Sequence, residues 1–131
     1  MTRIIQLSDI HMVDTGALAY DVVDTAAYLE RAVSYIRELL PNIGPVEGVV
    51  ITGDLTDHGL QSQYARLNEL LSPLDLPICL MPGNHDNRDV MRASFPGQSW
   101  QSDQNQLNTH VRFGDVHVLA LDSLVSGRAH G

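Results

Sequence analysis

The sequence predicts one α/β domain, built on a parallel sheet and closed by an antiparallel hairpin. Two features carry this prediction. Short β-like apolar runs alternate with segments of helical periodicity as far as Phe95, and two further β-like runs then follow with only Gly114-Asp115 between them. Alternating strands and helices imply right-handed crossovers between parallel neighbours, whereas a two-residue connection joins antiparallel strands. The chain of 131 residues is 44% hydrophobic, which is enough for one domain with a sizeable core.

The first predicted strand covers residues 4–7, and a polar, glycine-containing loop follows it to about residue 24. A helix then begins near Asp24 or Thr25, because either side chain can accept a hydrogen bond from the free amides of a first turn. We expect this helix to end at Pro41, since proline rarely continues a helix. Its apolar residues recur at helical spacing and predict one buried face: Leu29, Ala32, Val33, Ile36, Leu39 and Leu40.

A second strand is predicted over residues 46–52, and its continuous β-branched run is typical of a strand buried between two layers. Gly59 leads into a second helix, and Pro73 and Pro77 bracket its exit. The buried stripe of this helix has helical spacing: Tyr64, Leu67, Leu71 and Leu74. A third strand is predicted over residues 78–81.

A short helix is predicted from Asn87, which suits a cap, to about Phe95. The segment up to Asn105 is expected to be an ordered loop, anchored by Trp100. Two strands over residues 107–113 and 116–121 then form the hairpin, and the remaining residues form a loop. The sequence contains no internal repeat and no linker, so residues 1–131 are expected to form a single domain or part of one.

Charge and cysteine content limit the classes of function. The formal net charge of -8 argues against broad binding to nucleic acid, yet an anionic substrate is compatible with it if bound divalent cations reverse the local sign. Cys79 is the only cysteine, so no internal disulfide can form; we expect a small core residue and a reducing compartment. The sequence shows no secretory signal and no run long enough to span a membrane, which predicts a soluble, cytoplasmic protein.

Side chains that can bind metal follow each of the three parallel strands. Asp9 and His11 follow the first strand, Asp54 the second, and Asn84 and His85 the third. Parallel strands end at the same edge of a sheet, so these side chains are expected to meet there. Carboxylate, imidazole and amide ligands together suit Mn, Fe or Zn. Two such cations about 3.5–4 Å apart can hold a hydroxide and clamp the attacking and leaving oxygens of a phosphate ester.

Neighbouring polar residues are given supporting roles. His85 is expected to stabilise charge on the transferring phosphate or to protonate the leaving alkoxide, and Asp86 to fix the tautomer of His85. Asp57 is expected to cap the following helix rather than bind metal. His58 fits two interpretations equally, as a residue that approaches the substrate phosphate or as a solvated loop histidine.

The motifs together resemble the calcineurin-like metallophosphoesterase superfamily. The resemblance rests on Asp9-Ile10-His11, on Gly53-Asp54-Leu55-Thr56-Asp57-His58-Gly59 and on Gly83-Asn84-His85-Asp86. With Ser8 and the later Leu121-Asp122-Ser123 included, the chain is most similar to the bacterial class III cyclic-nucleotide phosphodiesterases, and almost as similar to glycerophosphodiesterases.

This resemblance implies a four-layer α/β/β/α sandwich with a dinuclear metal centre. It implies that Asp9 and His11 bind one cation, that Asp54 bridges both, and that Asn84 binds the second. Asn84 and His85 would contact the substrate phosphate. The implied activity is hydrolysis of a small phosphodiester, such as a cyclic nucleotide, by a hydroxide held between the two cations. The alternative is a non-catalytic, phosphoesterase-like scaffold or protein-binding module, for which intact metal ligands would be unnecessary.

The sequence departs from the family pattern in its histidines. The family completes its site with three more histidines, two of them in a Gly-His-x-His motif, and no Gly-His pair occurs here. His110, His117 and His130 lack that context, and His117, in an apolar strand, is expected to be a core histidine. We therefore expect this chain to be the amino-terminal half of a longer sandwich. Such a half would hold the second cation weakly, have low activity alone and expose an apolar face that favours homo-oligomers.

Overall fold

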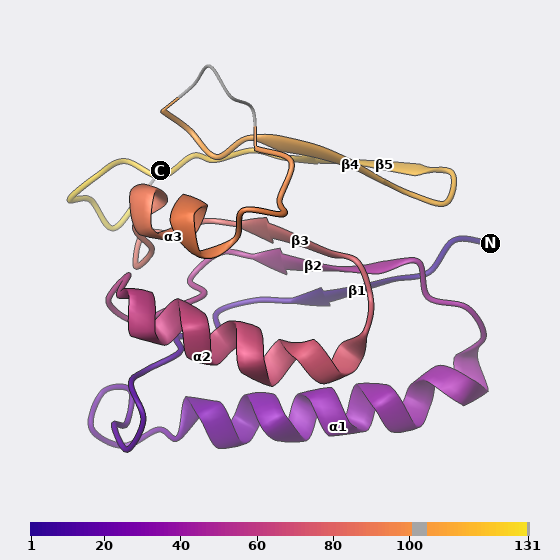
Figure 1. Cartoon of the computed structure of the whole chain (residues 1–131), viewed down its shortest axis with the longest axis horizontal. Coiled ribbons are helices and arrows are strands. Elements are labelled where there is room, and N and C mark those ends of the chain that lie inside the picture. Colours follow the sequence, from indigo (N-terminus) through magenta and orange to yellow (C-terminus); the bar gives the residue numbers. More distant parts are fainter. Residues whose placement is uncertain (101–104, 131) are drawn as a thin grey trace.

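The computed structural model describes residues 1–100 and 105–130. Two long helices cover one face of a three-stranded sheet, and a two-stranded hairpin covers the other face (Figure 1). These three layers are consistent with the expected amino-terminal half of an α/β/β/α sandwich, and the predicted order of elements is confirmed. The elements are β1 (Ile4–Leu7), α1 (Thr25–Ile43), β2 (Gly48–Thr52), α2 (Gln61–Leu71) with the 3-10 turn η1 (Ser72–Leu74), β3 (Ile78–Met81), α3 (Arg88–Ser94), β4 (Thr109–Phe113) and β5 (Val116–Ala120).

The three strands of the larger sheet are parallel and lie in the order β1-β2-β3. Leu7 pairs with Ile51, and Ile51 pairs with Leu80, so the carboxyl ends of all three strands are nearly level. The loops that follow them therefore begin along one edge of the sheet. This is the arrangement that the alternation of strands and helices predicts.

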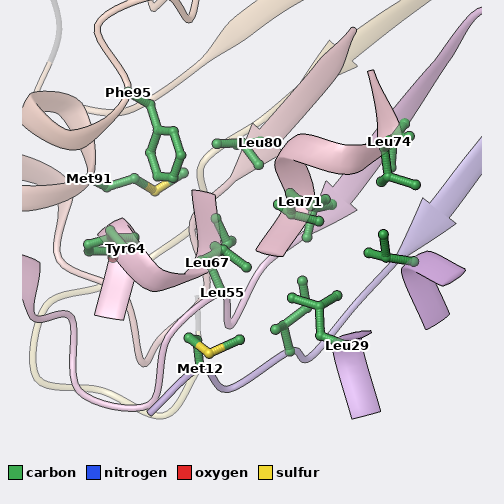
Figure 2. Close-up of a cluster of buried hydrophobic side chains, with 14 of the residues drawn as sticks. Met12, Leu29, Leu55, Tyr64, Leu67, Leu71, Leu74, Leu80, Met91 and Phe95 are labelled. Carbon is green, nitrogen blue, oxygen red and sulfur yellow. The ribbon is translucent and has the colours of Figure 1, made fainter. Parts of the chain in front are cut away.

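The central strand β2 is buried on both faces, as its continuous apolar run predicts. Val49 and Ile51 face the helices and join the larger core cluster. Figure 2 shows Leu67, Leu71 and Leu80 of that cluster packed together. Val50 faces the hairpin, where it packs in a second cluster with the buried Cys79. The helical residues of the larger cluster include most of the two predicted stripes: Leu29, Val33, Ile36, Tyr64, Leu67, Leu71 and Leu74. Leu40 is partly buried against this cluster, whereas Ala32 and Leu39 are partly exposed and do not belong to it.

Helix α1 starts where the sequence predicts and ends later. The Asp24 side chain accepts a hydrogen bond of 3.0 Å from the amide of Ala27 and so caps the helix. The predicted end at Pro41 is wrong, because the helix continues to Ile43. A proline in the last turn removes a backbone hydrogen bond only near the helix end, where bonding is already incomplete. Gly44, with a φ of 80°, ends the helix instead.

The third helix and the hairpin agree with their predictions. The Asn87 side chain accepts hydrogen bonds from the first turn of α3, which confirms the predicted cap. Phe113 pairs with Val116 in antiparallel register, so the predicted two-residue turn joins the strands. Trp100 packs against the larger core cluster and anchors its loop. Residues 101–104 of that predicted loop lie outside the described residues.

His117 is not a core residue, and this prediction is wrong. Val118 is partly buried and Ala120 is buried toward the sheet, so the alternation of a strand turns His117 outward. It is exposed on the outer face of the hairpin, where its ring lies 5.0 Å from that of His110 and nearly parallel to it. Leu119 is also exposed on that face. Among the described residues, no helix has the length and apolar character needed to cross a membrane.

Candidate metal centre

The loops after β1 and β2 stay side by side beyond the ends of the strands. The amide of Asp9 donates to the Gly53 carbonyl at 3.2 Å, and the amide of His11 donates to the Asp54 carbonyl at 2.9 Å. Asp9, His11 and Asp54 have positive φ angles of 54°, 47° and 48°, a region that Asp and His adopt more readily than most residues. These turns bring one ligand atom of each side chain within 4.8 Å of the other two. The structure thus brings together three of the predicted ligands.

Gly83 allows the third loop to approach this group. A Cβ atom at Gly83 would lie 2.2 Å from Asp54 Oδ1 and 2.3 Å from the Asp54 amide nitrogen, so only glycine fits here. The amide of His85 donates to Asp54 Oδ1 at 3.1 Å. Asn84 is exposed, and together with Asp9 and Asp54 it lines a cavity of about 230 Å³. Asn84 is therefore placed beside the two carboxylates, and its role as a ligand stays a prediction.

The orientation of His11 depends on Asp57. His11 Nδ1 lies 3.2 Å from Asp57 Oδ1, and His11 Nε2 lies 3.6 Å from Asp54 Oδ2. If Nδ1–H donates to Asp57, the lone pair on Nε2 is left for a metal, as in other carboxylate–histidine pairs. The predicted capping role of Asp57 is wrong, because α2 begins after Leu60 without a side-chain cap. The amide of Asp57 donates to the Met12 carbonyl, which turns the loop inward toward the centre.

His85 is oriented by a backbone carbonyl and not by its sequence neighbour. Its Nδ1 lies 2.9 Å from the Asp57 carbonyl oxygen, which leaves Nε2 as the free ring nitrogen. Its ring meets that of His11 edge-on, with 4.7 Å between the centroids. His11, Asp57 and His85 also bring one ligand atom each within 4.8 Å of the others. The predicted pairing of Asp86 with His85 is wrong, because Asp86 points into the protein.

The buried Asp86 carboxylate connects the two loops that follow β2 and β3 to helix α2. Oδ2 accepts from the amides of Leu55 (3.0 Å) and Gly83 (2.9 Å). Oδ1 accepts from the amide and hydroxyl of Thr56 (3.1 and 3.0 Å) and from the Tyr64 hydroxyl (2.9 Å). Burial raises the pKa of the Asp86 carboxyl, and the hydrogen bonds only partly oppose this. Burial beside Asp86 also raises the pKa of Tyr64, which keeps its hydroxyl protonated as a donor.

The segment after β5 also lines the cavity. Arg88 of α3 binds Asp122 through two hydrogen bonds of 2.6 and 2.8 Å, and Asp122 also accepts from the amides of Leu107 and Leu124. Burial disfavours the charged form of Asp122, but these donors outweigh it and hold the pKa of that carboxyl below its usual range. Leu124 and His130 line the same cavity as Asp9 and Asp54. The sequence had no motif that would place His130 here.

The charges of this cluster fit a bound cation. Three carboxylates lie around His11, those of Asp9, Asp54 and Asp57. Within the described residues, the ion pairs of Asp54 and Asp57 are formed with histidines. Clustered carboxylates favour a divalent cation, and a mixed carboxylate and imidazole set suits a transition metal. His58 is exposed on the rim, with Nδ1 3.6 Å from Asp57 Oδ2, so its role stays a prediction.

Known proteins share this sequence pattern. A sequence model of the calcineurin-like phosphoesterase family matches residues 2–128. A probable glycerophosphodiester phosphodiesterase from Arcobacter nitrofigilis is 32% identical over 128 residues, which cover 98% of this chain and 46% of the relative. A 3′,5′-cyclic adenosine monophosphate phosphodiesterase from Pseudomonas aeruginosa is 30% identical over 128 residues, covering 98% and 44%. A probable cyclic nucleotide phosphodiesterase from Rhodococcus erythropolis is 30% identical, covering 98% and 42%. The chain thus spans less than half the length of each of these relatives.

Proposed function

We propose that this chain, which belongs to the calcineurin-like phosphoesterase family, is a metal-dependent phosphodiesterase. The substrate we propose is a small phosphodiester, a cyclic nucleotide or a glycerophosphodiester, since relatives are named for both activities. The observation that carries the proposal is the convergence of Asp9, His11 and Asp54, which come from two separate strand ends.

We assign the metal ligands as follows. Asp9 and His11 would hold one divalent cation, Asp54 would bridge to a second, and Asn84 would bind that second cation through its amide oxygen. The donor set favours Mn, Fe or Zn. When bound, such cations supply a nucleophile at neutral pH and positive charge for the phosphate oxygens.

The chain's own residues would orient both the ligands and the substrate. Asp57 fixes the ring of His11 through Nδ1, so that Nε2 faces the carboxylates. The Asp57 carbonyl fixes the ring of His85 in the same way. The free Nε2 of His85 can then contact a phosphate oxygen or, when protonated, give a proton to the leaving alkoxide. Asn84, which is exposed beside the cavity, would contact the same phosphate.

Metal binding by substituted chains tests the proposal. We expect the chain to take up Mn²⁺ or Zn²⁺, measured by plasma mass spectrometry after dialysis, and we expect Asp54→Ala to lose most of this uptake. Asp89→Ala, an exposed carboxylate on α3, is the matched control and should bind metal normally. His85→Ala should keep the metal but lower phosphodiester turnover. Equal metal content in the wild type and Asp54→Ala would refute the assignment and favour the non-catalytic scaffold.

We also propose a cytoplasmic location and self-association. The location rests on the single cysteine, which cannot form an internal disulfide and is buried. Self-association would use the outer face of the hairpin, where Leu119 and Leu121 are exposed. Sedimentation of the wild type beside a Leu119→Lys variant tests this second proposal, because a dimer through this face should dissociate in the variant.

A further inference from the structure

The loop between β1 and α1 presents Tyr20 at the tip of a sharp turn. The amide of Val22 donates to the Ala19 carbonyl at 3.1 Å, and Ala19 and Val23 exchange two backbone hydrogen bonds of 2.9 Å. Tyr20 and Asp21 have φ angles of 51° and 61°. Positive φ at both central residues is the signature of a type I′ turn, which favours glycine, asparagine and aspartate. A bulky aromatic residue in this conformation is an outlier.

The Tyr20 side chain lies beside the candidate metal centre and is open to solvent. Its ring centroid lies 6.0 Å from that of His11, at an interplanar angle of 56°. Tyr20 is 66% exposed, and Leu18 and Val22 on the same loop are exposed as well. The exposed tyrosines of α1, Tyr28 and Tyr35, lie in regular helix and do not share this strained backbone.

The loop that carries Tyr20 is held at both ends. Arg66 of α2 donates to the carbonyls of Val13 and Asp14 at 3.0 and 2.9 Å, and the Thr25 hydroxyl donates to the His11 carbonyl at 3.0 Å. Ala19, at the base of the turn, is buried. The ring is therefore presented from a fixed position, and not from a freely moving loop.

We propose that Tyr20 is a substrate-contacting residue that stacks against a flat, apolar ester substituent of the phosphodiester. This inference rests on the proposed function, because the phosphate must lie at the metal centre for its substituent to reach Tyr20. A residue kept in an unfavourable backbone conformation next to a site is a recurring sign of function, since asparagine would fit the turn with less strain. An aromatic ring beside His11 offers a face for stacking on a nucleobase or another aromatic group.

The test compares two phosphonates, which contain an unreactive carbon–phosphorus bond. Titration calorimetry on the Mn²⁺-loaded chain gives the affinity for phenylphosphonate and for methylphosphonate, and their ratio isolates the contribution of the aromatic ring. We expect the wild type to prefer phenylphosphonate by roughly twofold to tenfold, as aromatic pairs contribute in other proteins. Tyr20→Phe should keep this ratio.

Tyr20→Asn should bring the ratio close to one and leave the methylphosphonate affinity unchanged. In metal-free chain, Tyr20→Asn should unfold at the same or a higher urea concentration, because asparagine suits the positive φ. Tyr35→Asn on α1 is the control and should keep the wild-type ratio. An unchanged ratio in Tyr20→Asn, a lost ratio in Tyr20→Phe or Tyr35→Asn, or clear destabilisation by Tyr20→Asn would overturn the inference. Equal binding of both phosphonates by the wild type would overturn it alone, whereas no metal-dependent binding of either would overturn the proposed function as well.

Discussion

Gly83→Ala should weaken metal binding without unfolding the chain. The added Cβ atom would lie 2.2 Å from Asp54 Oδ1 and 2.3 Å from the Asp54 amide nitrogen, and one of these contacts is with backbone. Ordinary contacts between such atoms are about 3.5 Å, so the loop or the Asp54 carboxylate must move by roughly 1 Å. Metal–ligand distances tolerate only about 0.2 Å. We therefore expect metal affinity to fall by about tenfold to a hundredfold, the range found when groups that orient ligands are removed.

Competition between the protein and a chromogenic chelator for Zn²⁺ measures this change directly. Gly97→Ala is the matched control, because nothing lies within 4 Å of the added atom and its affinity should equal that of the wild type. Circular dichroism and urea unfolding of both variants separate a displaced ligand from a lost fold. A Gly83→Ala variant that binds Zn²⁺ within about twofold of the wild type would refute the reasoning, because the contact distances leave no room for an undisturbed Asp54.

Three further predictions concern the residues that hold the layers and loops together. Asp86→Asn should lower the free energy of unfolding by roughly 1–3 kcal/mol, as measured by urea unfolding. Three backbone N–H groups donate to the Asp86 carboxylate, and no orientation of an amide can accept from all three. Gly48→Ala should lower it by about 1–3 kcal/mol, since the added Cβ would lie 2.2 Å from the Phe113 ring; thermal unfolding checks this. The lowered pKa of Asp122 stabilises the folded state above the usual value of 3.8, and that stabilisation should disappear as the pH falls through the lower folded pKa; urea midpoints between pH 6 and pH 3 measure it.

Each of these predictions has a result that contradicts it. Asp75→Asn, an exposed aspartate, is the control for Asp86→Asn and should change stability by less than about 0.5 kcal/mol; similar values for the two would show that the buried hydrogen bonds contribute little. A Gly48→Ala variant as stable as Gly97→Ala would mean that the hairpin moves freely on the sheet. Asp122→Asn should lose less stability in acid than the wild type, and an equal loss would assign the acid transition to other carboxylates.

The parallel sheet could be predicted from sequence, and so could the meeting of the three loops that carry the motifs. Both follow from local sequence signals. Apolar runs define the parallel strands, and parallel strands end at one edge, so Asp9 and Asp54 had to lie near each other. The spacing also predicted the Asn87 cap and the turn of the hairpin. The end of α1 could not be found in this way. Pro41 lies two residues before the end of the helix, and a proline so close to the end does not stop the helix at its own position.

The predictions for Asp57 and Asp86 were wrong for a reason that lies in tertiary structure. Asp86 directly follows His85 and Asp57 shortly precedes the second helix, so local sequence assigns the first to His85 and the second to a helix cap. The structure shows that His85 turns its Nδ1 to the carbonyl of Asp57, while Asp86 turns away to accept five hydrogen bonds. The partner of a buried carboxylate is set by which backbone amides lack other acceptors, and that becomes known only when the loops are placed side by side.

The candidate centre is therefore a product of backbone conformation as much as of ligand chemistry. Asp9, His11 and Asp54 all adopt positive φ, and each turn is needed because a regular strand would point residues 9 and 11 along its own pleat, away from the carboxylate of the neighbouring loop. A substitution at these positions changes both the donor atom and how readily the residue adopts the positive φ of the turn. Gly83 offers no donor side chain, so its substitution acts only through the contact of the added Cβ atom with Asp54. Loss of metal on Gly83→Ala would for that reason demonstrate that the backbone, and not the residue types alone, sets the geometry of the site.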